Sequence, residues 1–179
     1  MSAVTDAVRS ALGPDVLAAD AGFGSPTLDV AVERWAVAVA AAYDAGATYL
    51  DLLTAYDLEG DGFAVVAHVC TPDASDHLLL RTRVPRDAAS LPTLTGIHRG
   101  AAWHERETHE MFGIGFLGHV GLDPLLLDPD VVTTPLRKDA LLMARLAAPW
   151  PGDVDPGDTA GRPRRRTPPP GVPVDWESS

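Results

Sequence analysis

TYLDLLTAYDLEGDGFAVVAHVCTPDASDHLLLRTRV, residues 48–84, predicts three β-strands in succession. We expect strands at Thr48–Tyr56, Gly62–Thr71 and His77–Val84, because apolar and β-branched residues run together or alternate there. The connector Glu59-Gly60-Asp61-Gly62 is rich in residues that tolerate positive φ, so the first two strands should form an antiparallel hairpin. The third strand should bury one set of alternate residues and expose the other, partly basic set. The set expected to be buried is Leu78, Leu80, Thr82 and Val84.

Helices are predicted on both sides of these strands. Thr5–Leu12 should form a short helix that stops at Gly13-Pro14, since glycine can cap a helix and proline cannot continue it. A second helix should end at Gly46, because apolar residues precede it at three- and four-residue spacing: Val32, Trp35, Val39 and Tyr43. Alternation at Leu28, Val30 and Val32 suggests another strand or its end, and Ala101–Met111 is compatible with a helix that breaks at Gly113. We therefore expect an α+β fold in two layers, a small mainly antiparallel or mixed sheet with helices on one face.

The last third of the chain is poor in regular patterns. Prolines and glycines between Gly115 and Pro135 exclude long helices or strands, so this part should run as an extended segment. Leu141–Ala148 could form one or two helical turns. Residues 149–179 hold eight of the sixteen prolines together with Arg164-Arg165-Arg166, too little apolar surface to build a core. We predict one domain over residues 1–148 and a Pro/Arg-rich tail over 149–179, either solvated or ordered on a partner.

Charge and composition exclude several classes of function. The net charge of −11 argues against binding nucleic acid, which needs a basic footprint, and favours solubility or a basic docking partner. Residues 1–9 lack the basic start and apolar run of a signal peptide, and the longest apolar stretch, Trp35–Tyr43, is too short to cross a bilayer. The expectation is a soluble intracellular chain that reaches a membrane only through a partner.

Cofactor chemistry is not expected on this chain. Its one cysteine, Cys70, lies in the apolar run of the second strand and is expected in the core. An iron–sulfur cluster normally needs four thiolates, or two thiolates and two histidines, so the chain cannot hold one alone. There is also no glycine-rich dinucleotide fingerprint, phosphate loop or nucleophile elbow in the sequence.

Charged residues gather in WHERETHEMFGI, residues 103–114. A metal hydrolase built on His104, His109 and the neighbouring acids is one reading, but these histidines are five residues apart, about 140° around a helix. His98 could join them only through an irregular turn. The spacing instead favours ion pairs at four-residue separation on an exposed face, Arg106 with Glu110 and Glu105 with His109. Met111, Phe112, Ile114 and Phe116 should anchor the helix on the sheet.

The order of these motifs resembles one family, the 30 kDa subunit of respiratory complex I, which is named C in bacteria. The resemblance rests on Glu105, Arg106, Glu107, Glu110, Met111, Phe112, Gly113, Ile114, Gly118, His119, Leu126, Leu127 and Pro135 to Asp139. Three places depart from the family pattern: Val120, Asp123 and Val132-Thr133-Thr134. Upstream, roughly from Leu28 to Val84, only the order of elements is similar.

The resemblance implies a non-catalytic subunit in the hydrophilic arm of proton-translocating NADH:quinone oxidoreductase. Neighbouring subunits would carry FMN, the iron–sulfur clusters and the electrons from NADH to quinone. Its partners at the cytoplasmic side of the cell membrane would be the D-type subunit and the cluster-bearing, quinone-proximal B-type subunit. The residues expected at the subunit interface are Glu105, Arg106, Glu107, Glu110, His119, Arg137, Lys138 and Asp139. The alternatives are the equivalent subunit of an energy-converting hydrogenase or ferredoxin-fed relative, the free-standing metal hydrolase, and a general acidic scaffold.

Overall fold

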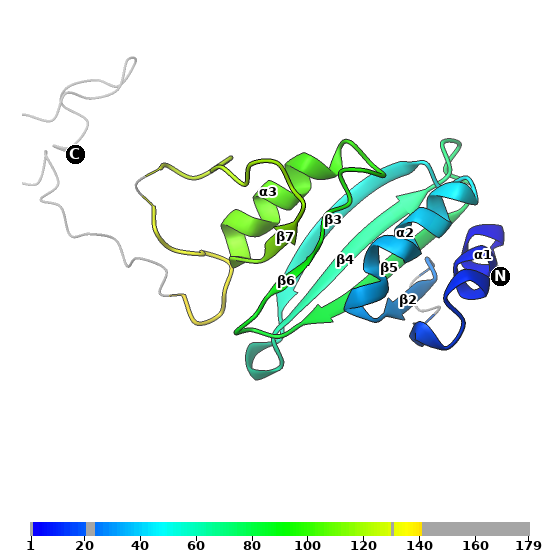
Figure 1. Ribbon diagram of the computed structural model, residues 1–179, viewed down its shortest axis with the longest axis horizontal. Helices are drawn as coiled ribbons and strands as arrows, with labels where there is room; N and C mark the ends of the chain where they lie inside the picture. The colour runs from blue at the N-terminus through cyan, green and yellow to red at the C-terminus, as the bar shows by residue number, and fades with distance from the viewer. Residues whose placement is uncertain (1, 21–23, 130, 141–179) are drawn as a thin grey trace, which may run out of the picture. The chain divides into compact units, whose positions relative to one another are not determined.

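The computed structural model describes residues 2–20, 24–129 and 131–140 (Figure 1). Five strands form one sheet in the order β1-β2-β5-β4-β3. Their bounds are β1 (Val16–Asp20), β2 (Thr27–Val30), β3 (Tyr49–Asp57), β4 (Phe63–Cys70) and β5 (His77–Val84). The helices are α1 (Ala3–Leu12), α2 (Trp35–Asp44) and α3 (Ala101–Phe112), and the 3-10 turns are η1 (Gly13–Asp15), η2 (Val32–Arg34) and η3 (Glu59–Asp61). Two short strands, β6 (Ser90–Pro92) and β7 (Gly115–Leu117), form a separate parallel pair.

The hairpin of β3 and β4 is confirmed. The strands are antiparallel and joined by η3, where the amide of Leu58 donates to the carbonyl of Gly62 at 2.9 Å. Gly62 closes the turn with a φ of 91°, a conformation that residues with a side chain rarely adopt. The next strand, β5, is antiparallel to β4 and parallel to β2, so the sheet is mixed. The buried alternate positions of β5 are those predicted.

An additional edge strand, β1, was not predicted. It is antiparallel to β2 and contains an irregularity between Val16 and Ala18. Leu17, at that irregularity, is 68% exposed. Because most of β1 is exposed, it carries no alternation of buried and exposed residues that would distinguish it in sequence.

The first helix agrees with its prediction and begins two residues earlier. The Ser2 hydroxyl accepts the amide of Thr5 at 3.2 Å, which caps the amino end of α1. Gly13 follows the helix with a φ of 54°. The second helix begins later than predicted, at Trp35, because Val32 belongs to η2. Its buried residues are Trp35, Ala38, Val39 and Ala42.

The fold has two layers, as predicted. Buried side chains of all three helices join the buried positions of the sheet in one apolar cluster, so the helices lie on one face of the sheet. In Figure 1, α1 and α2 lie across β2 and β5, and α3 lies beside β3, with which it makes extensive contacts. The opposite face of the sheet carries exposed Leu52 and Tyr56. Cys70 is buried, as expected, and burial raises the pKa of its thiol.

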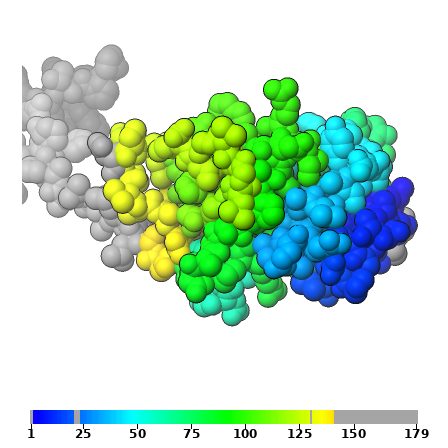
Figure 2. Space-filling view, viewed as in Figure 1, coloured from blue at the N-terminus to red at the C-terminus, as the bar shows by residue number. Residues whose placement is uncertain are grey.

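Beyond β7, residues 118–129 and 131–140 follow an irregular path, as predicted. In Figure 2 this segment, yellow-green to yellow, lies against α3 and forms part of the same surface. The predicted helical turns at 141–148 and the tail at 149–179 lie outside the described residues. Within the described ranges, no helix combines the length and apolarity needed to cross a membrane.

Candidate functional site

Helix α3 carries four of the eight residues expected at the interface, Glu105, Arg106, Glu107 and Glu110. Its carboxyl end is capped by Gly113, whose φ of 74° is left-handed and whose amide donates to the carbonyl of His109 at 2.7 Å. Phe112 packs edge-on against Phe63 of β4, with ring centroids 6.1 Å apart. Ile114 and Phe116 are buried and Met111 is half-buried. The predicted apolar anchor of this helix is confirmed.

Glu105 does not lie on an exposed face, and that expectation was wrong. Its side chain is 0% exposed and accepts hydrogen bonds from the Thr93 hydroxyl and from the Leu94 amide, the latter at 2.6 Å. The predicted pairing with His109 is also wrong, since the Nδ1 atom of His109 contacts the carbonyl of Ile114 at 2.9 Å. Glu105 therefore ties α3 to the 93–95 turn from inside the body.

Burial raises the pKa of Glu105 above its ordinary value of 4.5, although the hydrogen bonds from Thr93 and Leu94 act in the opposite direction. A raised native pKa means that the folded chain binds more protons than the unfolded chain, so this group lowers stability as pH rises through and above 4.5. We expect the free energy of unfolding of Glu105→Gln, measured by urea denaturation, to increase relative to that of the wild type as the pH is raised from 4 to 8. Glu107→Gln, on the exposed side of the same helix, should follow the wild type at both pH values. Parallel behaviour of all three proteins would contradict the buried carboxyl.

Arg106 and Glu110 hold the irregular segment through its backbone. Arg106 donates from Nε to the carbonyl of Asp123 at 3.0 Å and from Nη2 to that of Pro124 at 2.7 Å. The carboxylate of Glu110 accepts the three amides of residues 125–127 at 2.9 to 3.1 Å. The predicted ion pair between these two described side chains is not formed. Burial raises the pKa of Glu110, but the three amides and the nearby Arg106 charge together lower it, so the carboxylate stays ionised.

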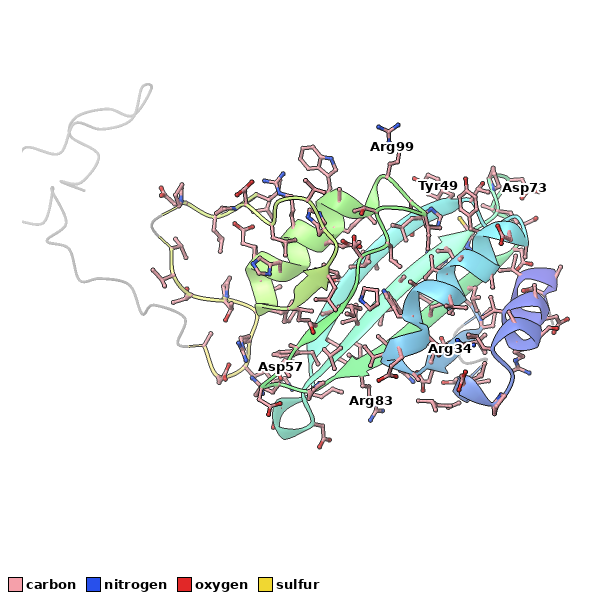
Figure 3. The ribbon with its side chains drawn as sticks, viewed as in Figure 1. Arg34, Tyr49, Asp57, Asp73, Arg83 and Arg99 are labelled. Carbon is pink, nitrogen blue, oxygen red and sulfur yellow. The ribbon has the colours of Figure 1, made fainter. Side chains whose placement is uncertain are left out.

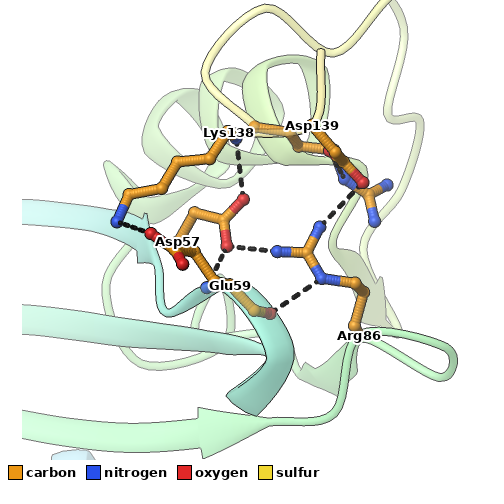
Figure 4. A network of polar contacts seen from close by, with 6 residues as sticks. Asp57, Glu59, Arg86, Lys138 and Asp139 are labelled. Carbon is orange, nitrogen blue, oxygen red and sulfur yellow. Dashed lines mark hydrogen bonds and ion pairs between the residues drawn. The ribbon is translucent and has the colours of Figure 1, made fainter.

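The other end of the segment is fixed by a second network, centred on Asp57 (Figure 4). Asp57 ends β3, its side chain is 1% exposed, and it accepts the amide of Glu59 at 2.6 Å and that of Lys138 at 2.9 Å. The guanidinium of Arg86 pairs with Asp57 and, at 3.0 Å, with Asp139. Lys138 Nζ lies 3.0 Å from Glu59 Oε1. The motif at residues 135–139 thus closes the segment onto the β3–β4 hairpin.

Two arginines of this network also contact one aromatic ring. The guanidinium carbons of Arg86 and Arg137 lie 4.8 and 5.0 Å from the ring centroid of Phe63. Such cation–π contacts add about 0.5–1 kcal/mol each at exposed sites. Burial raises the pKa of Asp57, but the two backbone amides and Arg86 outweigh it and lower that pKa. The network is therefore charged at neutral pH.

Sequence reasoning missed Asp57 and Arg86. Asp57 does carry a sequence signal, because it is an aspartate at the end of an apolar strand and lies just before a turn. An aspartate in that position can accept the backbone amide two residues further on, here that of Glu59. Nothing in the local sequence connects Asp57 with Arg86 or with Lys138, since these contacts join residues 29 and 81 positions apart. The internal contacts of Arg137, Lys138 and Asp139 were not predicted, and their interface role stays a prediction.

The outer side of α3 presents a different set of residues. Trp103 is 64% exposed, and the Arg106 guanidinium carbon lies 5.8 Å from its ring centroid. Glu107 is exposed beside it. His119 contacts the carbonyl of Ala102 at 3.2 Å, which fixes the loop after β7 on the helix. Trp103 was not among the predicted interface residues, yet exposed tryptophan next to arginine is typical of binding hot spots.

The arrangement does not favour the metal hydrolase. Within residues 2–20, 24–129 and 131–140, no three histidine, cysteine, aspartate or glutamate side chains are placed to hold a metal ion. His109 is engaged with the backbone of Ile114. What the site offers is a rigid helix with a segment fastened along it, a geometry suited to docking.

Comparison with known proteins identifies the family. Residues 28–145 match the family described as the respiratory-chain NADH dehydrogenase 30 kDa subunit. The subunit named C of F(420)H(2) dehydrogenase from Methanosarcina mazei is 39% identical over 80 residues, 44% of this chain and 51% of that protein. The subunit named C/D of NADH-quinone oxidoreductase from Pseudomonas fluorescens is 36% identical over 80 residues, 45% of this chain and 14% of that protein. The chain thus spans about half the length of the first relative and a small part of the second.

A solved structure has the same fold. A chain of the membrane-bound sulfane sulfur reductase, an archaeal respiratory membrane complex, superposes with a TM-score of 0.71 over 86% of this chain and 95% of that chain. At 22% sequence identity the likeness concerns the fold alone. The family match covers β2 to the closing motif at residues 135–139, the elements that build and fasten α3 and its segment. The chain belongs to the family of the 30 kDa subunit of respiratory-chain NADH dehydrogenase.

Proposed function

We propose that this chain is a non-catalytic structural subunit of the peripheral arm of a proton-translocating NADH:quinone oxidoreductase. The observation that carries the proposal is the family match over residues 28–145, which includes both α3 and the 135–139 motif. The D-type subunit is the proposed neighbour, since one relative carries the name C/D, and the B-type subunit is proposed with it from the sequence resemblance. Attachment to the cytoplasmic side of the membrane would come through the assembled complex.

In this proposal, electrons pass through neighbouring subunits. The chain has a single cysteine, which is buried in β4, and four thiolates are the usual requirement for an iron–sulfur cluster. Its contribution is geometric. Arg106, Glu110 and Asp57 hold the segment at residues 118–140 on the body before any partner arrives, which reduces the ordering cost of docking.

A donor other than NADH is the second candidate. The relative from Methanosarcina mazei is named a subunit of F(420)H(2) dehydrogenase and is 39% identical to this chain over 80 residues. This similarity is the reason for a second candidate, a complex that takes its electrons from reduced F420 or another donor. The two candidates share the docking role of this chain and differ in the neighbouring protein that receives the electrons. Reduction of quinone by the purified complex with NADH, reduced ferredoxin or reduced F420 separates them.

Purification of a tagged full-length chain from native membranes in mild detergent tests the proposal. We expect the D-type and B-type subunits to co-purify in equal amounts with it, together with flavin and iron–sulfur absorbance. Arg106→Glu should reduce the assembled complex on native gels several-fold, because the variant cannot donate to the two carbonyls of the segment. Turnover per assembled complex should stay unchanged, and Arg106→Lys, which keeps the charge but not the paired donors, should fall between.

Two results would contradict this function. One is a tagged chain that leaves the membrane alone or with unrelated partners. The other is an Arg106→Glu complex that assembles normally and loses turnover, since that result would mean that Arg106 takes part in the catalysed reaction. The melting temperature of each free variant, measured beside the native gels, distinguishes an assembly defect from misfolding.

A further inference from the structure

Two histidines on the face of the sheet opposite the helices form a chain of hydrogen bonds with Asp51 of β3 and with the turn between β4 and β5. The Nδ1 atom of His68 lies 2.8 Å from Oδ2 of Asp51, and its Nε2 atom lies 3.1 Å from Nδ1 of His77. The Nε2 atom of His77 lies 2.8 Å from the carbonyl oxygen of Ala74. The two rings are almost parallel, with an interplanar angle of 9°. One set of contacts thus joins three neighbouring strands and a turn.

This chain of contacts crosses one end of the sheet. Asp51 lies at the register shift of β3 and has no partner residue on β4. Ala74 has a φ of 55°, a left-handed conformation that is uncommon for residues other than glycine, so its part of the turn is strained. Figure 3 shows Tyr49, at the start of β3, and Asp73, in the turn, at the same end of the sheet, opposite the end that carries Asp57. The histidines therefore hold two irregular places of the backbone, the bulge of β3 and the turn.

The donors and acceptors of this chain of contacts determine where its protons lie. A carbonyl oxygen can only accept, so the contact with Ala74 requires a proton on Nε2 of His77. The Nδ1 atom of a neutral His77 then carries a lone pair, which accepts the proton on Nε2 of His68. The carboxylate of Asp51 also only accepts, so Nδ1 of His68 must carry a proton as well. All three contacts are hydrogen bonds at once when Asp51 is ionised, His68 is an imidazolium and His77 is neutral.

Adding a proton to this state, or removing one, breaks a contact. A proton added to Nδ1 of His77 would face the proton on Nε2 of His68 across 3.1 Å, so two donors and two positive charges would meet. One ring must then move, and either His77 releases the carbonyl of Ala74 or His68 releases Asp51. A proton removed from His68 leaves one of its nitrogens without a hydrogen, and one of its two contacts is lost. The charge of an imidazole ordinarily changes between about pH 5 and pH 8, so this arrangement is sensitive to pH near neutrality.

The charges around the two rings are mainly negative. Cys70 is the residue of β4 opposite the second histidine, and the pKa of its thiol is raised by burial and then by the charges of Asp51 and Asp73. Arg81, on the same face of β5, donates from Nε and Nη2 to Asp29 at 2.5 and 2.9 Å and is therefore neutralised. The titratable groups of the elements packed around the rings are Tyr49 and Asp51 of β3, Cys70 of β4, Arg81 and Arg83 of β5, Asp29 of β2, and Asp73 and Asp76 of the turn. These surroundings favour one positive ring, whereas a second positive ring would lie directly against the first.

We propose that Asp51, His68 and His77 form a pH-sensitive latch across this end of the sheet. The latch is closed in the state with one imidazolium, and it opens when the second histidine takes up a proton. Opening frees either the strained turn or the bulge of β3. Because β3 is the edge strand of the sheet and contacts α3, the latch acts on the strand that supports the candidate docking helix. The inference concerns this chain alone and does not depend on the proposed membership of a quinone oxidoreductase.

Nitrogen-15 NMR of the histidine rings in the full-length chain tests the latch. With the latch closed, the ring nitrogen shifts should show two protonated nitrogens in His68 and one, Nε2, in His77. A scalar coupling across the hydrogen bond should connect Nε2 of His68 with Nδ1 of His77. In a titration from pH 8 to pH 5, we expect this coupling to disappear as His77 becomes charged. His104, on α3, is the internal reference and should titrate in a single step without such a coupling.

Asp51→Asn separates the charge from the hydrogen bond. The variant keeps an acceptor oxygen but removes the charge that balances the imidazolium, so His68 should be neutral at a pH at which the wild-type ring is still charged. The matched control, Asp61→Asn, removes an exposed aspartate from η3 at the other end of the β3–β4 hairpin and should leave both rings unchanged. The backbone amide spectrum of each variant reports whether the fold is kept.

Three results would overturn the latch. The first is that the two rings titrate independently and show no coupling at any pH. The second is that His77 becomes charged while its coupling to His68 persists, since the two rings would then not oppose each other. The third is that Asp51→Asn keeps the fold and titrates like the wild type, since Asp51 would then not hold the proton on His68.

Discussion

Asp57→Ala should lower the free energy of unfolding by roughly 3 kcal/mol. The substitution removes the acceptor for the amides of Glu59 and Lys138 and leaves the Arg86 guanidinium without its buried counter-ion. Because the native pKa of Asp57 is lowered, its stabilising contribution is complete above 3.8, the ordinary value, and is lost as the pH falls below it. Urea denaturation of the free chain at pH 7 measures the loss, and faster amide exchange at Lys138 would report release of the segment.

The matched control for this variant is Asp139→Ala. Asp139 pairs with the same guanidinium at 3.0 Å, but its side chain is 61% exposed, so its removal should cost no more than about 1 kcal/mol. The difference between the two aspartates comes from the burial of Asp57 and from the two backbone amides that it accepts. Equal losses in the two variants would show that the amide contacts of Asp57 contribute little.

Gly62→Ala should destabilise the chain even more, by about 3 kcal/mol or above, and should reduce the yield of soluble protein. With a φ of 91° and a ψ of −139°, Gly62 adopts a conformation reserved almost wholly for glycine. A Cβ atom there would lie 2.2 Å from the carbonyl oxygen of Val84 and 3.1 Å from Cα of Pro85. Both neighbours are backbone atoms, one in the last residue of β5 and one in the residue that follows it, so neither can move without disturbing the sheet.

Gly60→Ala provides the control in the same turn. No atom lies within 4 Å of a Cβ built at Gly60. The substitution should be neutral or should stabilise by up to about 1 kcal/mol, because alanine has less freedom than glycine in the unfolded chain. Thermal denaturation of both variants tests the contrast, and a Gly62→Ala chain that melts with the Gly60→Ala chain would refute the steric argument.

The sheet could be predicted where its pattern is local. The β3–β4 hairpin is specified by adjacent apolar strands and a turn of four residues, and β5 by strict alternation, so all three were found with small errors in their bounds. The edge strand β1 could not be found in this way. Its residues are mostly exposed, and only its pairing with β2 makes it a strand.

The candidate site shows the limit of helical spacing as a guide. Four-residue separation predicted partners for Arg106 and Glu110 on the helix surface, but both side chains bind backbone groups 15 to 18 residues further along the chain. Glu105 turns inward because the 93–95 turn supplies donors there. These contacts depend on the path of an irregular segment, which no periodicity of the sequence describes.

The fastening of that segment through main-chain atoms has a consequence for its evolution. Arg106 and Glu110 recognise carbonyls and amides that every residue type but proline provides in full, so side chains at 123–127 are free to change while the path of the segment is kept. Asp123 contributes to the contact only its carbonyl. Substitutions there can alter which surface the segment fits without weakening its attachment, so a lineage can adapt this region to a changing partner while the body beneath it remains the same.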